Sequence, residues 1–268
     1  MNTDCSVLIP SCDSYSDLWE PFFTLFERFW PDCPFPVYLG NNSLSFERAG
    51  VRLIHSSQGN NWTNRVRDHL KAIDTPYVLL MLEDFFLRHR VRTDRILAGL
   101  DVLAARDGRL LRLHPRPRPS VRLAGWPEAG SIPVGTPYRV STQAAIWRRE
   151  TILSLMRDSE SIWQFEIRGT ERSAAFSDGF FSFWDSVLPY DHHVVERGKW
   201  FPRDARYFKA QNIGCDLARR PVMSAGEYCA YAIHAAGSEV LHSVPAVRKL
   251  GVVGRLRVFK NMAANERE

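Results

Sequence analysis

The sequence predicts an α/β fold in which a mostly parallel, Rossmann-like sheet is flanked by helices. Apolar strand-like segments alternate with amphipathic helical segments over about the first 115 residues. The most apolar run, residues 77–82, has the character of a central strand buried on both faces. A length of 268 residues with 45% hydrophobic and 24% charged content suits one compact domain and argues against disorder.

Each element is predicted by its local pattern. The helix at 17–30 has an apolar stripe at helical period, with Asp17 and Glu20 at capping-box spacing and prolines beyond its end. Thr93 or Asp94 is the expected cap of a later helix. The full set of expected strands is 6–10, 36–39, 51–54, 77–82, 110–113 and 139–141, and that of expected helices is 17–30, 62–73, 93–105 and 149–157.

The rest of the chain is less regular. Residues 114–137 are rich in Pro, Arg and Gly and are expected to form a long loop, which in a compact domain is usually functional. The last third shows little periodicity and is expected to form an irregular C-terminal extension. We expect one domain over residues 1–245 and a basic tail over 246–268, in which 247–260 mixes five basic residues with apolar ones. Such a tail suits an anionic membrane surface, or a closing helix packed on the domain.

Charge and cysteine content indicate which partners and which cellular compartment to expect. The net charge of +5 fits anionic partners, such as a nucleotide diphosphate or an acidic membrane surface, and gives no reason to expect nucleic acid. Five cysteines without CxxC spacing favour reduced thiols in the cytoplasm. The polar N-terminus does not have the pattern of a secretion signal, and no apolar run approaches the ~20 residues of a membrane span. We therefore expect a cytoplasmic protein with, at most, peripheral attachment to the inner membrane.

Two acidic residues follow the most apolar strand. In a Rossmann-like sheet, ligands bind beyond the carboxyl ends of the strands, which is where Glu83 and Asp84 are expected. A charged pair at the end of a buried strand needs compensation, and Mg²⁺ or Mn²⁺ bridging a diphosphate would supply it. The alternative is a strand end that simply reaches solvent.

Two further residues are candidates for donor contacts. Asp13, in the loop after the first strand, is placed to accept hydrogen bonds from a base or ribose, or to cap the following helix. Arg65, near the start of the helix before the acidic strand, suits a phosphate, or is a solvated surface arginine.

The segments 141–147 and 163–170 hold the candidates for an acceptor and a base. Gln143 offers a donor and an acceptor for sugar hydroxyls, while Trp147 and Trp163 offer apolar faces. Glu166 stands among aromatics, which raises a carboxyl pKa and suits a general base. Each of these candidates has a purely structural alternative, such as a tryptophan packed in the core or a glutamate paired with an arginine.

Other common sites are absent from the sequence. There is no GxSxG, Walker A or GxGxxG element, which weighs against common hydrolase, P-loop and dinucleotide functions. The histidines show no metal-ligand spacing. His192 and His193 are adjacent and would face opposite ways in a strand, and His234 and His242 are weak candidates to complete a metal site.

Several segments together resemble a group of bacterial glycosyltransferase-like proteins from polysaccharide gene clusters. They cover most of residues 7–200 and are fairly specific only in combination: IPSCDSYSDLWEPFFTLFERFWPDCPFPVYLG, YVLLMLEDFFL, STQAAIWRRE, WQFEIRGTERS and VVERGKW. The resemblance implies a GT-A fold and a nucleotide-sugar donor. In that fold a strand-end Asp-x-Asp binds metal and diphosphate, whereas here Phe86 stands where the second Asp is expected.

The resemblance leads to a specific functional expectation. The chain would transfer a sugar from a nucleotide-sugar donor to a carbohydrate or glycolipid acceptor in capsule or O-antigen (lipopolysaccharide) synthesis. Inversion is expected, with Glu166 as the base and Asp178 or Asp185 as alternatives. Two rival hypotheses are a glycoside hydrolase that pairs Glu83 or Asp84 with Glu166, and a non-catalytic scaffold of a polysaccharide assembly complex.

Overall fold

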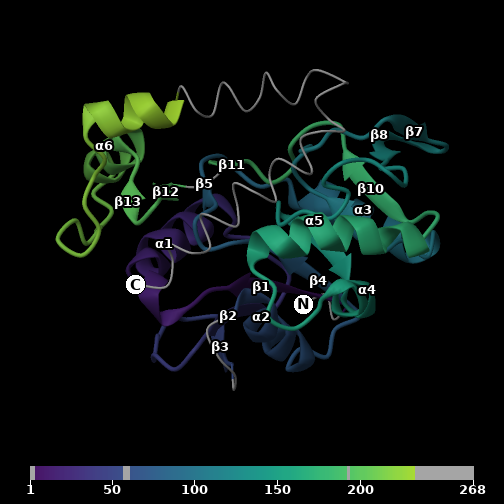
Figure 1. Cartoon of the computed structure of the whole chain (residues 1–268), viewed down its shortest axis with the longest axis horizontal. Helices are drawn as coiled ribbons and strands as arrows, with labels where there is room; N and C mark the ends of the chain where they lie inside the picture. Colours follow the sequence, from purple (N-terminus) through teal and green to yellow (C-terminus); the bar gives the residue numbers. More distant parts are fainter. Residues whose placement is uncertain (1–3, 57–60, 192–193, 233–268) are drawn as a thin grey trace. The chain divides into compact units, whose positions relative to one another are not determined.

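The structure, a computed structural model, describes residues 4–56, 61–191 and 194–232 (Figure 1). The chain divides into two compact units: Met1–Val194 with Asn212–Asp216, and Val195–Gln211 with Leu217–Glu268. His192, His193, His234, His242, the domain boundary at 245/246 and the basic stretch 247–260 lie outside the described residues, so the expectations attached to them stay predictions.

The first unit is built on a nine-stranded sheet with the order β3-β2-β1-β4-β9-β6-β10-β8-β7. Neighbouring strands are parallel from β3 to β4 and between β6 and β10, while β9 and β8 run antiparallel to their neighbours. The predicted class, a mostly parallel Rossmann-like sheet flanked by helices, is confirmed. The strands of this sheet are β1 (Cys5–Pro10), β2 (Val37–Asn41), β3 (Val51–His55), β4 (Tyr77–Leu80), β6 (Leu110–Arg112), β7 (Val121–Leu123), β8 (Trp126–Ser131), β9 (Ala145–Arg148) and β10 (Phe180–Phe183).

Helices cover both faces of this sheet because its central strands carry apolar side chains on both sides. On one face Leu8, Val78 and Leu80 pack against α2, α4 and α5. On the other face Gly99 of α3 comes close to Leu111 and Phe183. The helices of this unit are α1 (Trp19–Phe29), α2 (Trp62–Lys71), α3 (Thr93–Ala105), α4 (Arg149–Leu155) and α5 (Ile162–Arg172), with short 3₁₀ turns η1 (Asp13–Leu18) and η2 (Ser173–Ala175).

The helix caps differ from those predicted. The capping box at Asp17 and Glu20 is wrong: the 3₁₀ turn η1 precedes α1, whose N-cap is Leu18, without a side-chain cap. The N-cap of α3 is Arg92 rather than Thr93 or Asp94. A capping box does occur at α5, where Ser161 and Gln164 each bond the other's backbone N–H. That helix is absent from the sequence prediction.

Two expectations for residues 114–141 are wrong. The stretch 114–137 is not loop throughout, because it contains the hairpin β7–β8, whose turn includes Gly125 at positive φ. Residues 139–141 do not form a strand. The guanidinium of Arg139 is drawn into the core, where it donates to the carbonyls of Ile132, Ser173 and Phe176 and lies 3.9 Å from the Phe180 ring centroid.

The remaining short strands are β5 (Phe86–Leu87), which pairs with β11 (Tyr190–Asp191), and β12 (Val195–Glu196), which pairs with β13 (Lys199–Trp200). The second unit contains this last hairpin and the helix α6 (Pro202–Ala210). No helix among the described residues has the length and apolar character needed to cross a bilayer. All five cysteines are free.

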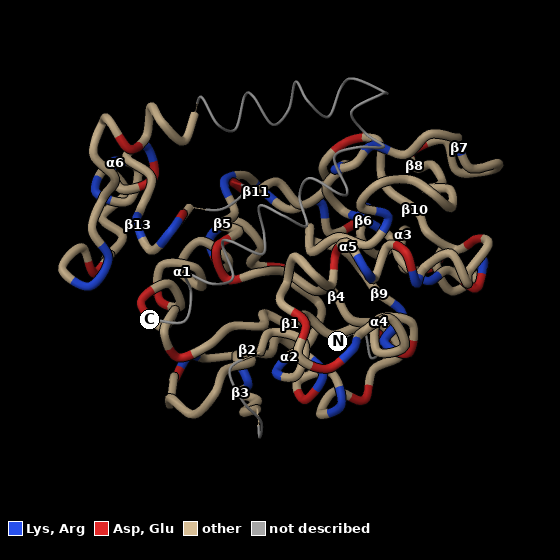
Figure 2. The backbone as a smooth tube through the Cα atoms, in the orientation of Figure 1, with Lys and Arg blue, Asp and Glu red and all other residues tan. Residues whose placement is uncertain are grey.

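Acidic and basic residues are interspersed along the described backbone (Figure 2). Several charges are neutralised locally. One example is Glu160, which is almost fully buried and receives two hydrogen bonds from Arg172, at 2.9 and 2.7 Å. This bidentate pair joins the N-terminal approach of α5 to its last turn.

The close contact between β2 and α2 provides a test of the packing. A Cβ on Gly40 would lie 2.3 Å from Nδ1 of His69, whose side chain is fully buried. We expect Gly40→Ala to lower the free energy of unfolding by about 1–3 kcal/mol, because the buried ring has no room to move. Gly214→Ala is the matched control, since nothing lies within 4 Å of that site. Urea denaturation measures both, and equal midpoints for the two variants would contradict the prediction.

Candidate active site

The candidate site lies at the edge of the sheet where the parallel strands end. Leu80, the last residue of β4, is paired with Ala145, the first residue of β9. Because β9 runs antiparallel to β4, the residues before Ala145 lie at the same edge as those after Leu80. Arg112, which ends β6, is also paired with Ala145. Segments far apart in the sequence therefore converge at this edge: 11–13, 81–85, 112–116 and 142–144.

The acidic pair follows β4 directly. Glu83 and Asp84 are both half-buried, and the backbone turns there, with the N–H of Phe85 donating to the carbonyl of Leu82. The ring of Phe85 stacks on Tyr190 at 4.6 Å between centroids. Burial is the main cause of the raised pKa of Tyr190, and the charge of Asp84 adds to it. The predicted position of the acidic pair, at a strand end on the ligand-binding edge, matches the structure, whereas its role stays a prediction.

Tyr190 is the centre of a buried polar arrangement that the sequence analysis missed. Its hydroxyl donates to Oε1 of Gln143 at 2.8 Å and accepts from the N–H of Ala144 at 3.1 Å. Its ring lies 5.0 Å from that of His114, measured between centroids. Burial is the main cause that raises the pKa of Tyr190, so the phenol stays protonated and can donate. Gln143 is therefore held by Tyr190 and is 8% exposed.

Glu166 projects from α5 to the segment before β9. The backbone N–H and the hydroxyl of Thr142 both donate to Oε1 of Glu166, at 2.6 and 2.9 Å. Burial raises the pKa of this carboxyl above its ordinary value, although the two bonds from Thr142 and the charge of Arg112 oppose the shift. Oε2 accepts no hydrogen bond from the described residues. The carboxylate thus has one oxygen fixed and one available to a ligand.

The raised pKa of Glu166 has a different cause from the one predicted. From the sequence, aromatic neighbours are expected to raise it. Phe165 instead points into the core, against Trp62, and Trp163 is 47% exposed. Trp163 is three residues before Glu166 on α5, so the two lie on the same side of that helix. An exposed indole beside a carboxylate keeps the acceptor role of Trp163 open as a prediction.

Arg112 and His114 are further residues that the sequence analysis did not select. Arg112 is fully buried, and burial lowers its pKa to about 10 while the charges of Glu166 and Tyr190 act in the opposite direction. His114 bonds the hydroxyl of Ser186 through Nδ1 at 3.1 Å. Burial, Arg116 and Arg112 lower the pKa of His114 to about 4, so the ring is neutral at pH 7. Both could have been found from the sequence by applying the rule that ligands bind at strand ends to the predicted strand 110–113.

Asp13 lies at the end of β1 and binds the loop after β2. Its carboxylate accepts from the backbone N–H groups of Asn42, Ser43 and Leu44, and from the hydroxyl of Ser43 at 2.7 Å. Burial acts to raise the pKa of Asp13, but these bonds outweigh it and the net pKa is lowered. The carboxylate thus joins two loops of the site edge. Its contact with a nucleotide stays a prediction.

Arg65 lies at the ligand-binding edge, whereas Trp147 is buried in the core. Arg65 lies in the first turn of α2, which begins at the ligand-binding edge because it connects the end of β3 to the start of β4. Its role stays a prediction. Trp147 is 1% exposed, in the core against Phe180, and has no face for a sugar ring. We therefore do not retain it as an acceptor contact. Because side chains alternate between the two faces of a strand, the position of Trp147 on β9 directs its indole into the core.

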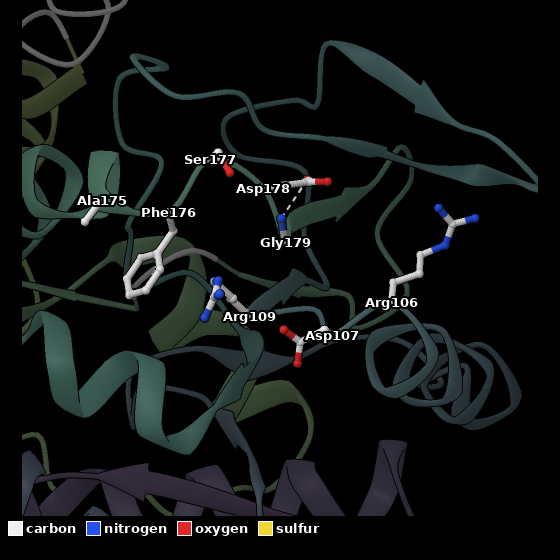
Figure 3. Close-up of a pocket in the computed structure, with 8 residues that line it drawn as sticks. All are labelled: Arg106, Asp107, Arg109, Ala175, Phe176, Ser177, Asp178 and Gly179. Atoms are coloured by element: carbon white, nitrogen blue, oxygen red, sulfur yellow. Dashed lines mark hydrogen bonds between the residues drawn. The ribbon is translucent and has the colours of Figure 1, made fainter.

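The two alternative bases are placed less favourably. Asp178 lies before β10, at the opposite edge of the sheet, where its carboxylate accepts from the N–H of Gly179 at 2.6 Å (Figure 3). It lines an open cavity of about 200 Å³ with Arg106, Asp107 and Arg109. Asp185 follows β10 at the ligand-binding edge and is exposed. Of the three carboxylates, Glu166 is the one hydrogen-bonded to the segment that precedes β9, at the ligand-binding edge.

A preformed metal cage is not part of this site. Within residues 4–56, 61–191 and 194–232, no three His, Cys, Asp or Glu side chains are grouped to hold a metal ion. Mg²⁺, however, is commonly bound through one or two carboxylates together with substrate phosphates and water. Glu83 and Asp84, half-buried at a strand end, fit that kind of site, in which the diphosphate supplies the remaining ligands.

Comparison with known proteins gives likeness in structure alone. No family model matches the chain, and no curated protein matches it in sequence. Staphylococcus aureus TarS, residues 1–349, aligns at 13% identity and a TM-score of 0.48, covering 70% of this chain and 59% of that one. Glucosyl-3-phosphoglycerate synthase from Mycobacterium tuberculosis, in complex with Mn²⁺, UDP and phosphoglyceric acid, aligns at 11% identity and a TM-score of 0.47, covering 84% and 81%.

A third structure extends the same pattern. A protein from Desulfovibrio desulfuricans, provisionally described as a nucleotide-diphospho-sugar transferase, aligns at 9% identity and a TM-score of 0.44. The alignment covers 82% of this chain and 92% of that one. Likenesses of this size do not assign an activity. The chain spans only 59% of the length of the TarS structure.

The contribution of the Tyr190 hydroxyl to stability can be tested by removing its oxygen. Tyr190→Phe leaves the buried N–H of Ala144 without its acceptor, which costs about 1–3 kcal/mol in the free energy of unfolding. Tyr38→Phe is the control, because that hydroxyl only accepts from the exposed Arg52 at 3.2 Å. Urea denaturation should show a clear loss for the first variant and a change within about 0.5 kcal/mol for the second. Equal stabilities would contradict this role of Tyr190.

Proposed function

We propose that this chain is a GT-A glycosyltransferase that moves a sugar from a nucleotide-sugar donor to a carbohydrate or glycolipid acceptor, with inversion. The observation that carries the proposal is the meeting, at one sheet edge, of the strand-end pair Glu83 and Asp84 with Glu166, which comes from a helix more than 80 positions later. Single displacement needs charge stabilisation on one side of the reacting sugar and a base on the other.

The donor end of the site lies over β1 and β4. Asp13 and Arg65 would contact the nucleotide and its phosphates, with Asp84, helped by Glu83, holding the metal. A bound Mg²⁺ or Mn²⁺ would neutralise the charge that develops on the leaving diphosphate. In this chain the turn at Leu82–Phe85 and the stacking of Phe85 on Tyr190 hold Asp84 in place.

The acceptor end lies over β9. Thr142 fixes Oε1 of Glu166, which leaves Oε2 to accept the proton of the attacking hydroxyl. A raised pKa makes the carboxylate a stronger base than an ordinary glutamate. Gln143, oriented by Tyr190, and the exposed Trp163 would contact the acceptor sugar.

The cellular role follows the sequence resemblance. We infer participation in capsule or O-antigen synthesis at the cytoplasmic face of the inner membrane, with the basic segment 247–260 in contact with anionic lipid. That attachment stays a prediction of the sequence, which liposome flotation would test.

The base is tested by Glu166→Gln, which keeps the shape and removes the basicity. We expect kcat to fall at least about 100-fold, the lower end of what a positioned base contributes, with donor affinity within about twofold of wild type. Glu171→Gln, at an exposed position on the same helix, is the control and should leave kcat unchanged. Product analysis by mass spectrometry and NMR after a donor screen gives the readout. A retained anomeric configuration, or near-normal turnover of the variant, would overturn the assignment.

The same preparation gives a pH test. Since Glu166 must be ionised to act as a base, kcat/KM should rise with pH through a pKa above the ordinary glutamate value of about 4.5. Glu166→Gln should lose this acidic limb of the profile.

The donor side is tested by calorimetry with nucleoside diphosphates, with and without Mn²⁺. We expect Mn²⁺ to tighten binding of at least one of them, and Asp84→Asn to remove most of that gain, about tenfold or more in Kd. Asp101→Asn, exposed on α3, is the control. If wild-type protein binds no nucleotide, glycosyl transfer is the wrong function, and hydrolysis of a glycoside without nucleotide in the same samples would favour the hydrolase alternative.

A further inference from the structure

Two exposed arginines stand on the segment that follows β6. Arg116 and Arg118 alternate with prolines in the run 114–119. Neither side chain forms an ion pair or a hydrogen bond with any residue in the described part of the chain. By contrast, Arg48 pairs with Glu20 and Glu27, and Arg88 pairs with Asp191. The two cations are therefore available to a ligand.

The backbone between these arginines is fixed by a buried group. Nη1 of Arg112 donates to the carbonyl of Pro117 at 3.1 Å, and its Nη2 donates to those of Tyr138 and Arg139 at 2.8 and 3.1 Å. The prolines restrict the same segment further, because each fixes its own φ angle. Arg116 is thus presented from a held backbone, which lowers the entropy lost when it binds a ligand.

The strand order places Arg116 relative to the proposed chemistry. Along the ligand-binding edge the order is β1, β4, β9, β6. Asp13 follows β1, Asp84 follows β4, Glu166 is bonded just before β9, and Arg116 follows β6. Arg116 therefore lies beyond Glu166 as seen from the donor end. Its charge acts on the site itself, since it contributes to the lowered pKa of His114 and opposes the raised pKa of Tyr190.

We propose that Arg116, assisted by Arg118, binds a phosphate or carboxylate group on the acceptor, so that the acceptor is an anionic sugar. The inference rests on the proposed glycosyl transfer and adds the chemical class of the acceptor. The planar guanidinium of arginine matches both oxyanions through paired hydrogen bonds. Such a cation also offsets the repulsion that an anionic acceptor meets from the Glu166 carboxylate, which a neutral sugar does not experience.

The test uses pairs of sugars in which one member carries an anionic group at C6 and the other does not. Methyl glucuronide and glucose 6-phosphate are the anionic probes, and methyl glucoside and glucose are their neutral counterparts. Binding is followed by NMR titration of wild type, Arg116→Gln and the control Arg52→Gln, an exposed arginine on β3 at the far end of the sheet. UDP with Mn²⁺ is titrated separately into all three proteins. Thermal unfolding confirms that the variants fold.

We expect wild type and Arg52→Gln to bind at least one anionic probe about tenfold more tightly than its neutral counterpart. Arg116→Gln should lose this preference and bind UDP with unchanged affinity. No preference for charge in wild type, or a preference that survives in Arg116→Gln, would overturn the proposal. An equal loss of UDP affinity in Arg116→Gln would also overturn the proposal, because Arg116 would then bind the donor diphosphate. If no protein binds UDP but the preference depends on Arg116, glycosyl transfer fails while the anion site stands.

Discussion

The guanidinium of Arg112 is the group on which the candidate site depends. A fully buried cation is costly unless hydrogen bonds and an opposite charge compensate it. Arg112 obtains three carbonyl acceptors from residues 117, 138 and 139, and the Glu166 carboxylate lies close enough to oppose the fall in its pKa. These partners come from separate segments. When they compensate the Arg112 guanidinium, the loop after β6, the segment before β9 and helix α5 are brought to the same edge of the sheet.

A second buried arginine, Arg139, is also compensated by backbone carbonyls, outside the candidate site. Arg139 donates to three carbonyls and lies over the ring of Phe180. Together the two arginines replace the regular hydrogen bonding that residues 132–141 would have as a strand. The long connection between β8 and β9 is therefore held by side chains instead of by a backbone ladder, which frees Thr142 and Gln143 to bind Glu166 and Tyr190.

The site combines carboxylates in contrasting surroundings. Asp13 accepts several N–H groups and has a lowered pKa, while Glu166 is dominated by burial and has a raised one. A carboxylate that is fully hydrogen-bonded organises loops, and one with an oxygen to spare can take a proton. This contrast supports the role of base for Glu166 in the proposed transfer, while Asp13 joins the loops at the proposed donor end.

The sequence by itself determined the α/β class, the strands β1 to β4 and β6, and the place of Glu83 and Asp84 at a strand end. These follow from local periodicity and from the rule that ligands bind where parallel strands end. Tertiary structure alone decided that residues 139–141 leave the sheet, that Trp147 enters the core and that Tyr190 reaches Gln143. Each of these depends on burial or on a hydrogen bond between segments distant in sequence, such as the 47 positions between Tyr190 and Gln143. Local patterns do not encode such pairings, because the free energy that selects them arises only when the segments meet.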